Sequence, residues 1–252
     1  MKKLLTIAIA SIAVAAAADN TYSPSIGVTS ISLSQKNNVI PVQFNSLATS
    51  GNVTAGELVC TNNIPLNSHL YVYKDGGYTA WELQPSGWVG LSVASTADGI
   101  SYSGNANEKD LPAGSAIWLS FNAAPVSAID VSFYGKVATS TNTTIVAGAV
   151  SAPVCTLVCN PTGATVAGAT LVSKIASGIS PVKGDKITLV GGSSFDGYYS
   201  YSATSGKWKY VTTDSEGKTS ATVATPELPD LGPNQGFWYQ RSKGAAAGTI
   251  EW

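Results

Sequence analysis

The sequence contains one histidine, so any mechanism that needs an imidazole depends on His69. A serine nucleophile paired with this histidine would be expected in a sharp-turn motif such as Gly-x-Ser-x-Gly, which the sequence lacks. A zinc site would require His69 and the three cysteines, Cys60, Cys155 and Cys159, to converge on one point. We therefore predict that His69 is a structural or surface residue and that no metal is bound.

Cys155 and Cys159 lie four residues apart in the segment PVCTLVC, which has the composition of a strand. At ~3.3 Å per residue their Cα atoms would be ~13 Å apart, beyond the ~7 Å limit for a disulfide. These two cysteines therefore cannot bond to each other within a strand. A disulfide from Cys60 to either of them and a set of three free thiols both stay open.

Carboxylate pairs are a further route to catalysis, because a glycosidase needs only two. Asp110 and Asp230 stand at equivalent places before the segments LPAG and LGPN, where an aspartate that initiates a turn is expected. No motif pairs Glu82 with a second carboxylate, and the sequence contains no phosphate loop, nucleotide-binding fingerprint or EF-hand loop. We therefore expect a protein that is not an enzyme and that binds no cofactor and no nucleotide.

The first residues, MKKLLTIAIASIAVAAAADN, have the organisation of a secretory signal peptide. Lys2 and Lys3 precede an uncharged, mainly apolar run over residues 4–18. This run is too short to span a ~30 Å hydrocarbon layer, and it ends in the small residues that a signal peptidase needs. We predict a signal peptide at residues 1–18 and an exported protein, located outside the cell, at its surface or in the periplasm.

The chain beyond the signal peptide carries 12 basic and 15 acidic residues, a net charge of −3, and Arg241 is its single arginine. Nucleic acids and anionic membranes are bound by clusters of lysine and arginine. Charged residues make up only 12% of the chain, so such clusters are not available. We therefore expect neither nucleic acid nor an anionic membrane as a partner.

Aromatic residues recur at matched spacings in the two halves of the chain. In each half a tyrosine is followed ten residues later by a tryptophan, and this tryptophan is followed thirty residues later by a second one: Tyr78, Trp88 and Trp118, then Tyr198, Trp208 and Trp238. The segment DLPAGSAIWLSF also matches DLGPNQGFWYQR, and NVTAGELV matches TVAGATLV. These spacings predict two copies of one unit, a first β-repeat domain at residues 19–133 and a second at residues 134–252.

Short segments rich in β-branched and aromatic residues, such as VTSISLS, HLYVYK and KITLVG, are separated by Gly, Asn, Asp, Ser and Pro. No part of the chain beyond the signal peptide shows a sustained apolar period near 3.6 residues, so no amphipathic helix is predicted. The predicted fold class is all-β, with two tandem, duplicated β-sandwich or small-barrel units. One merged sandwich built from both copies is the alternative.

The two copies also predict which side chains face the core. Aligning HLYVYK with DKITLV matches His69 with Asp185 and places Tyr71 and Tyr73 on a core face. In AIWLS and GFWYQ, the residues on either side of the tryptophan form the core face. Trp118 and Trp238 therefore point the other way, where each ring covers a backbone gap, packs on the other copy or binds a ligand.

Aromatic residues found in both copies are interpreted first as determinants of the fold, because large rings dominate the energetics of cores. The alternative is a platform on which sugar rings stack. The segment DGYYSYSATSGKWKY in the second copy has the composition that such a platform needs. The candidate binding residues are Trp81, Trp88, Tyr199, Tyr201, Trp208, Tyr210 and Trp238.

The elements GDKI, GYYSY, GKW and GFW of the second copy, with degraded forms in the first, resemble those of uncharacterised exported tandem β-repeat proteins of Gram-negative bacteria. The first copy departs from this pattern, with NSHLY where the second has KGDKI. The resemblance implies export and a β fold. Because that family has no assigned activity, the resemblance implies no site.

These observations favour a non-catalytic, secreted or cell-surface protein that acts by association, as a component of a surface layer, a filament or an adhesion structure. The segment DNTYSPSIGVTSISLSQ is a candidate for pairing with the open sheet edge of a neighbour, so self-association or a cell-surface partner is expected. A carbohydrate-binding module, with a glycan as partner, is the first alternative. An outer-membrane β-barrel is the second, because the chain ends in the aromatic residue Trp252.

Overall fold

The computed structural model describes residues 26–48, 51–58, 63–74, 77–91, 110–111, 113–137, 141–162, 164–190, 197–213, 219–221, 228–232 and 235–252. Antiparallel strands dominate these residues, which confirms the all-β class predicted from the sequence. Among them, neither helix has the length and apolar character needed to cross a membrane. The predicted signal peptide and Cys60 lie outside the described residues.

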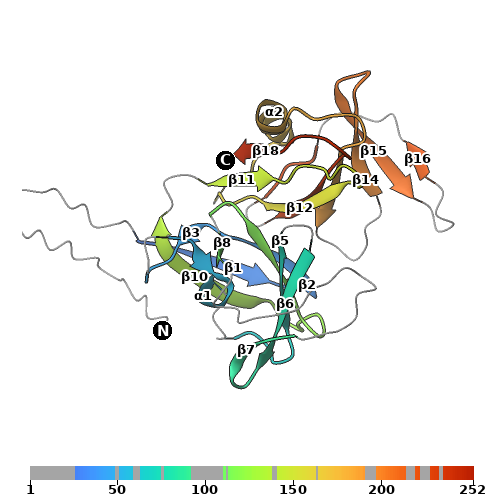
Figure 1. Cartoon of the computed structure of the whole chain (residues 1–252). Coiled ribbons are helices and arrows are strands. Elements are labelled where there is room, and N and C mark those ends of the chain that lie inside the picture. Colours follow the sequence, from blue (N-terminus) through green and yellow to red (C-terminus); the bar gives the residue numbers. More distant parts are fainter. Residues whose placement is uncertain are drawn as a thin grey trace, which may run out of the picture.

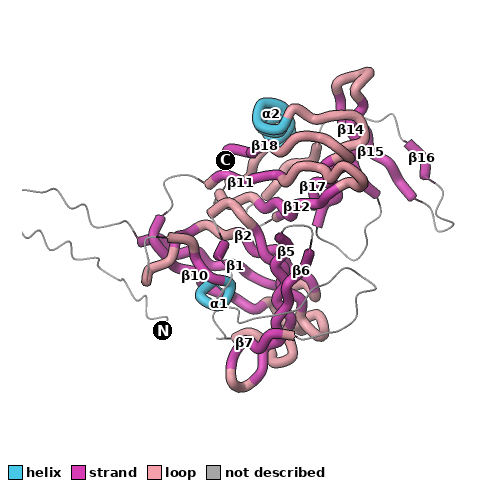
Figure 2. The backbone as a smooth tube through the Cα atoms, viewed as in Figure 1, coloured by secondary structure: helices cyan, strands magenta, loops and turns pink. Residues whose placement is uncertain are grey.

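The described elements form two groups that lie against each other (Figures 1 and 2). The first group contains β1 (Ile26–Leu33), β2 (Asn37–Pro41), β3 (Phe44–Asn45), β4 (Val53–Thr54), α1 (Ala55–Leu58), β5 (His69–Lys74), β6 (Gly77–Gln84), β7 (Gly87–Gly90), β8 (Asp110–Leu111), β9 (Ala116–Ser120) and β10 (Ile129–Val137). The second contains β11 (Asn142–Ile145), β12 (Val154–Cys159), α2 (Gly168–Ile179), β13 (Lys186–Val190), β14 (Gly197–Ser202), β15 (Lys207–Thr213), β16 (Thr219–Ala221), β17 (Gly236–Arg241) and β18 (Gly248–Glu251).

Each group is built on one larger sheet. The first central sheet has the strand order β2-β9-β5-β6-β7, and the second has the order β12-β17-β13-β14-β15-β16. One face of the first central sheet packs against the smaller sheet β1-β10-β3, and one face of the second packs against α2 and the pair β11-β18. Each group therefore has its own hydrophobic core.

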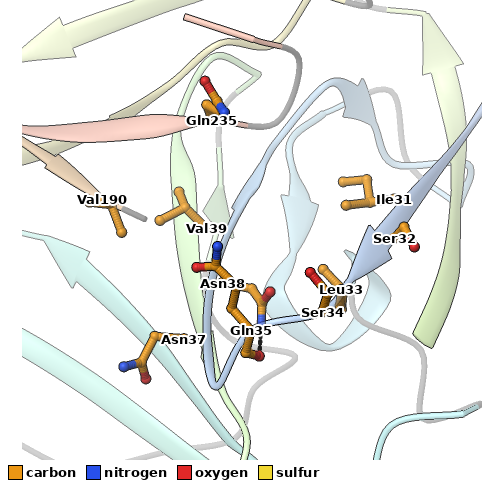
Figure 3. Close-up of a pocket in the computed structure, with 10 residues that line it drawn as sticks. All are labelled: Ile31, Ser32, Leu33, Ser34, Gln35, Asn37, Asn38, Val39, Val190 and Gln235. Atoms are coloured by element: carbon orange, nitrogen blue, oxygen red, sulfur yellow. Dashed lines mark hydrogen bonds between the residues drawn. The ribbon is translucent and has the colours of Figure 1, made fainter. Parts of the chain in front are cut away.

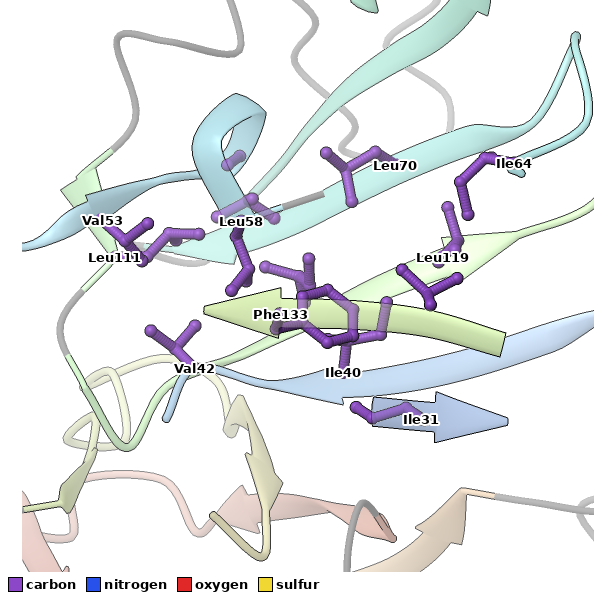
Figure 4. Close-up of a cluster of buried hydrophobic side chains, with 14 of the residues drawn as sticks. Ile31, Ile40, Val42, Val53, Leu58, Ile64, Leu70, Leu111, Leu119 and Phe133 are labelled. Carbon is purple, nitrogen blue, oxygen red and sulfur yellow. The ribbon is translucent and has the colours of Figure 1, made fainter. Parts of the chain in front are cut away.

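The core of the first group lies between the first central sheet and β1-β10-β3 (Figure 4). Phe133 of β10 lies near its centre, among Ile40, Leu70 and Leu119 from the central sheet. The alternation of β10, in which Val131 and Phe133 are buried and their neighbours exposed, is that of a strand with one face on a core. This core therefore follows from the period-two pattern visible in the sequence.

The short helix α1 begins at a capping box. The backbone N–H of Glu57 donates to Thr54 Oγ1 (3.2 Å), and the backbone N–H of Thr54 donates to Glu57 Oε2 (2.9 Å). The hydroxyl of Ser46 also donates to Glu57 Oε1 (3.0 Å). The hydrogen bond from the Thr54 backbone, followed by those from the side chains, holds the pKa of Glu57 below its usual range.

The prediction that the chain has no amphipathic helix is wrong, because α2 spans 12 residues. Leu171, Ile175 and Ile179 recur every four residues along it and form its buried face. A Cβ atom at Gly178 would lie 1.8 Å from the carbonyl oxygen of Thr249, so glycine is what allows α2 to approach β18 this closely. The small residues between the three apolar positions hide the helical period in the sequence.

The predicted alignment of β5 with β13 differs by one residue from the strand pairing. In the structure Tyr71 pairs with Trp118 and Thr188 pairs with Trp238, so counting from the two tryptophans places His69 level with Lys186 and not with Asp185. A shift of one residue reverses the face of every side chain in a strand. The buried face of β5 is accordingly formed by Leu70 and Val72, and the prediction that Tyr71 and Tyr73 face this core is wrong. 

The prediction for β9 and β17 is confirmed, and it determines how the two groups meet. The four residues that flank the tryptophans are fully buried in the two cores: Ile117, Leu119, Phe237 and Tyr239. Trp118 and Trp238 lie on the opposite faces, where the two central sheets pack on each other. Their ring centroids are 6.1 Å apart, and the ring of Tyr73 meets that of Trp238 edge-on at 5.3 Å.

We call the layer between the two central sheets the seam. Its apolar part consists of Val39, Ala116, Leu157 and Cys159, with Trp118, Val190 and Trp238 packed around them. A Cβ atom at Gly236 would lie 2.6 Å from the carbonyl oxygen of Val158 in β12 and 3.0 Å from the Cγ1 atom of Val39, so glycine leaves room both for the neighbouring strand and for the other sheet. Both faces of each central sheet are therefore in contact with other parts of the protein.

The end of the chain is tied to the first group by hydrogen bonds. The indole N–H of Trp252 donates to Thr143 Oγ1 (2.7 Å), and the hydroxyl of Thr143 donates to the carbonyl oxygen of Gly114, in the turn before β9. Thr143 is buried and belongs to β11, which pairs with the last strand, β18. Trp252 therefore helps to hold the two groups together.

The single arginine forms a buried ion pair in the second group. Arg241 and Asp185 are both almost completely buried, and Arg241 Nη1 donates to Asp185 Oδ2. Asp185 also accepts hydrogen bonds from the hydroxyl of Tyr239 (2.8 Å) and the backbone N–H of Ser242 (2.8 Å). Burial, followed by the nearby Asp185 carboxylate, raises the pKa of Tyr239 and keeps it protonated as a donor.

The remaining guanidinium atoms of Arg241 are also used. Nε donates to the carbonyl oxygen of Ala246 (2.7 Å), and Nη2 donates to that of Ile179 (3.0 Å), at the end of α2. Arg241 thus connects β17, the end of α2 and the turn that leads to β18. All partners are internal, so this charged cluster is a structural feature and not a site.

We expect Asp185→Ala to lower the free energy of unfolding by about 3–5 kcal/mol, because it leaves the Arg241 guanidinium buried without its counter-charge. Urea denaturation followed by tryptophan fluorescence measures this change. Asp130→Ala removes an exposed aspartate in β10 and is the matched control, with an expected change within about 0.5 kcal/mol. Equal losses of stability in the two variants would contradict the structural role of the ion pair.

Candidate functional site

The seven aromatic residues predicted to bind a ligand do not form one platform. Trp81 is 0% exposed in the first core, and Trp208 is 2% exposed in the second. Trp88 pairs with Leu83 and packs against the first core. A ring without an open face has no surface on which a sugar could stack, so Trp81 and Trp208 act as core residues, and the partly buried Trp88 packs at the margin of the first core.

Three of the predicted tyrosines gather on one hairpin, β14–β15, at the margin of the second core. Tyr201 packs against Trp208 with ring centroids 5.3 Å apart, and Tyr199 packs against Tyr210 at 5.0 Å. The ring of Tyr210 lies over Gly197, where a Cβ atom would be 2.8 Å from the phenol oxygen. Partial burial, followed by the neighbouring Tyr210, raises the pKa of Tyr199. Covering a glycine in a neighbouring strand is a structural use of an aromatic ring.

The seventh residue, Trp238, lies in the seam, where it packs against Trp118 and Tyr73.

The structure also shows a groove that sequence reasoning missed. The groove has a volume of about 240 Å³ and opens where the turn between β1 and β2 meets the end of β13 and the start of β17 (Figure 3). It is lined by Ile31, Ser32, Leu33, Ser34, Gln35, Asn37, Asn38, Val39, Val190 and Gln235. We call this feature the seam groove. Both groups contribute to it.

The polar side chains of the seam groove carry no formal charge. Three amides are each held at one end by the protein. Asn37 Oδ1 accepts from the indole N–H of Trp118 (3.4 Å) and the hydroxyl of Ser120 (2.8 Å). Asn38 Nδ2 donates to the carbonyl oxygen of Gln35 (2.8 Å), and Gln235 Oε1 accepts from the backbone N–H of Gly232 (2.9 Å).

His69 lies near this region but does not form a catalytic arrangement. His69 Nε2 is 3.3 Å from Glu82 Oε2, and Ser120 lies opposite His69 on the neighbouring strand. A serine nucleophile must be hydrogen-bonded to its histidine base, whereas the hydroxyl of Ser120 is bonded to Asn37. Ser120, His69 and Glu82 are the residue types of a catalytic triad, but the hydrogen bond from the serine to the histidine is not formed.

The two described cysteines are free thiols in β12, and they are not bonded to each other, as strand geometry predicts. Cys159 is completely buried in the seam, and burial raises its pKa. Cys155 is half-buried, and burial raises its pKa as well, while the charge of Lys186 acts in the opposite direction. Among the residues that the structure describes, no group of three or more His, Cys, Asp or Glu side chains is placed to hold a metal ion.

Comparison with known proteins adds no assignment. No protein-family model matches the chain, and neither the curated proteins nor the solved structures contain a significant match. The resemblance to exported tandem β-repeat proteins therefore stays a prediction.

We expect iodoacetamide to modify Cys155 and to spare Cys159 in the folded protein, tested in a Cys60→Ser background. Because burial raises the pKa of Cys155, its thiolate fraction and its labelling rate should increase at a higher pH than those of free cysteine. Mass spectrometry of labelled peptides across a pH series measures both rates. The control, Cys155→Ser in the same background, should take up label only after unfolding. Labelling of Cys159 at the rate of Cys155 would contradict the packing of the seam.

Proposed function

We propose that this protein is an exported, non-catalytic component that associates with copies of itself through the open edge of β1. The proposal rests on β1, an edge strand that lacks the features that normally prevent an edge from pairing with a strand of another molecule. Among the described residues, β1 is hydrogen-bonded to a strand on one side only, that of β10. Its eight residues, IGVTSISL, include no charge and no proline. Natural sheets usually protect such edges with lysine, proline or a bulge.

The outer face of β1 supports the same proposal. Ile26 and Val28 are 66% and 73% exposed, and Tyr134, which lies opposite Val28 on β10, is 62% exposed. Two copies could pair their β1 strands in antiparallel orientation, related by a two-fold axis at Val28. The exposed side chains of Val28 and Tyr134 from one copy would then lie beside those of the other copy. The occupant favoured by this surface is therefore a second copy of the chain, because an uncharged strand is compatible with itself.

We also propose that the two groups are copies of one duplicated unit. In both central sheets the edge strand that comes first in the chain (β2 or β12) pairs with the strand that comes last in the chain (β9 or β17). On its other side, that last strand pairs with the first strand of a meander, β5-β6-β7 or β13-β14-β15-β16. The pairing of Val53 with Leu111 has a counterpart in the bridge between Val166 and Leu231. Because β10 continues to Val137 and pairs with β1 and β3, we place the boundary after Val137 and not at residue 133.

We expect Val28→Lys to convert a self-associating protein into a monomer, because the charge would lie between the paired edges. Sedimentation velocity of residues 19–252, from nanomolar to high micromolar concentration, measures the change. The matched control is Val126→Lys, which introduces the same charge at an exposed position outside β1, in the segment before β10, and should leave association unchanged. A wild-type protein that stays monomeric over this range would refute the proposal, as would equal effects of the two variants.

A further inference from the structure

We propose that the seam groove is a binding site for an uncharged sugar residue of a glycan. The proposal concerns a different surface from the β1 edge and does not depend on self-association. The groove, at about 240 Å³, lies just below the roughly 300–1,000 Å³ typical of pockets for drug-sized ligands. A groove of this size accommodates a single small ring, with the rest of a chain-like ligand outside it.

The chemistry of the lining selects a neutral, polyhydroxylated ligand. Its side chains are amides, hydroxyls and aliphatic groups, and none of them is ionisable. An ionic ligand would lose hydration in the groove without meeting an opposite charge. A sugar hydroxyl is both a donor and an acceptor, so it matches a lining that offers both amide N–H groups and amide oxygen atoms.

The three anchored amides present their other ends outward. Because Asn37 uses its oxygen to hold Trp118 and Ser120, its Nδ2 atom remains as a donor. Gln235 likewise uses its oxygen internally and presents Nε2, whereas Asn38 uses its nitrogen and presents Oδ1. Two donors and one acceptor are thus fixed before a ligand arrives. Fixing them in advance lowers the entropy lost on binding.

Apolar surface lies beside these amides. Val39 and Val190 point toward each other across the groove from the two groups (Figure 3). An apolar surface next to fixed polar groups suits a pyranose ring, which has apolar C–H faces and a polar edge.

The site is complete only when both groups are docked. Asn37 and Asn38 are the first two residues of β2, whereas Val190 is the last residue of β13 and Gln235 immediately precedes β17. A ligand in the groove would therefore contact both groups at once. This explains why neither repeat, considered alone in the sequence, contains a recognisable sugar site.

Two isosteric variants test the proposal without removing the internal anchors. Asn37→Asp and Gln235→Glu keep the oxygen atoms that accept from Trp118, Ser120 and Gly232, but they replace each outward donor with an acceptor. We expect each to weaken binding of neutral oligosaccharides by about tenfold, the loss of one good hydrogen bond. The matched control is Asn122→Asp, an exposed position outside the groove, which should bind as the wild type does.

A glycan array with the purified chain of residues 19–252 identifies the neutral oligosaccharide, and titration calorimetry then measures its affinity for each variant. Circular dichroism shows that the variants fold. The Val28→Lys protein should bind the same glycan with unchanged affinity, which separates this proposal from self-association. No neutral glycan bound on the array, binding of charged glycans alone, or unchanged affinity in both groove variants would each overturn the proposal.

Discussion

The packing of the two central sheets on each other is the interaction on which the rest of this structure depends. Each sheet has apolar residues on both faces, and only one face of each is covered by elements of its own group. The second face is covered by the other sheet, where Trp118 and Trp238 meet. Without this contact, two tryptophans, a tyrosine and the thiol of Cys159 would lose much of their cover, at a substantial cost in hydrophobic free energy.

This contact also determines where a ligand could bind. Two sheets that pack at an angle leave space at their margin, where side chains from distant parts of the chain converge. Here the margin is filled with amides and not with charged residues, in keeping with a chain that has few charges of either sign. The charged pair that is buried, Asp185 and Arg241, is saturated with internal partners and lies in the second core. Buried polar groups in this protein therefore stabilise the second group, whereas the polar groups at the margin of the seam line the groove.

Much of the fold could be predicted from local pattern. Alternation identified the strands, and the residues that flank Trp118 and Trp238 were correctly assigned to the cores. The helix α2 was missed because alanine, serine and glycine separate its apolar residues, and because its stability comes from packing on β18 rather than from a strong propensity. The one-residue shift at β5 arose because alignment by residue type does not sense hydrogen-bond register.

The seam groove was beyond sequence reasoning for a different reason. Its polar residues are Ser32, Ser34, Gln35, Asn37, Asn38 and Gln235, and no motif links stretches that are about two hundred positions apart. Individually they have the composition of ordinary turns, where asparagine and glutamine need no further explanation. Conversely, the aromatic residues that attracted attention in the sequence are mostly buried, because large rings contribute most where water is excluded.

The hydrogen bonds from Trp252 through Thr143 to Gly114 have a consequence for the order in which the protein is made. The ribosome completes the first group early, yet the surface that covers its Trp118 face is supplied by β12 and β17, and a bond that fastens this arrangement is supplied by Trp252, which is further along the chain. Burial of that face must therefore wait until β17 has been synthesised. Until then the emerging chain carries an exposed apolar sheet surface, the kind of surface on which chaperones act.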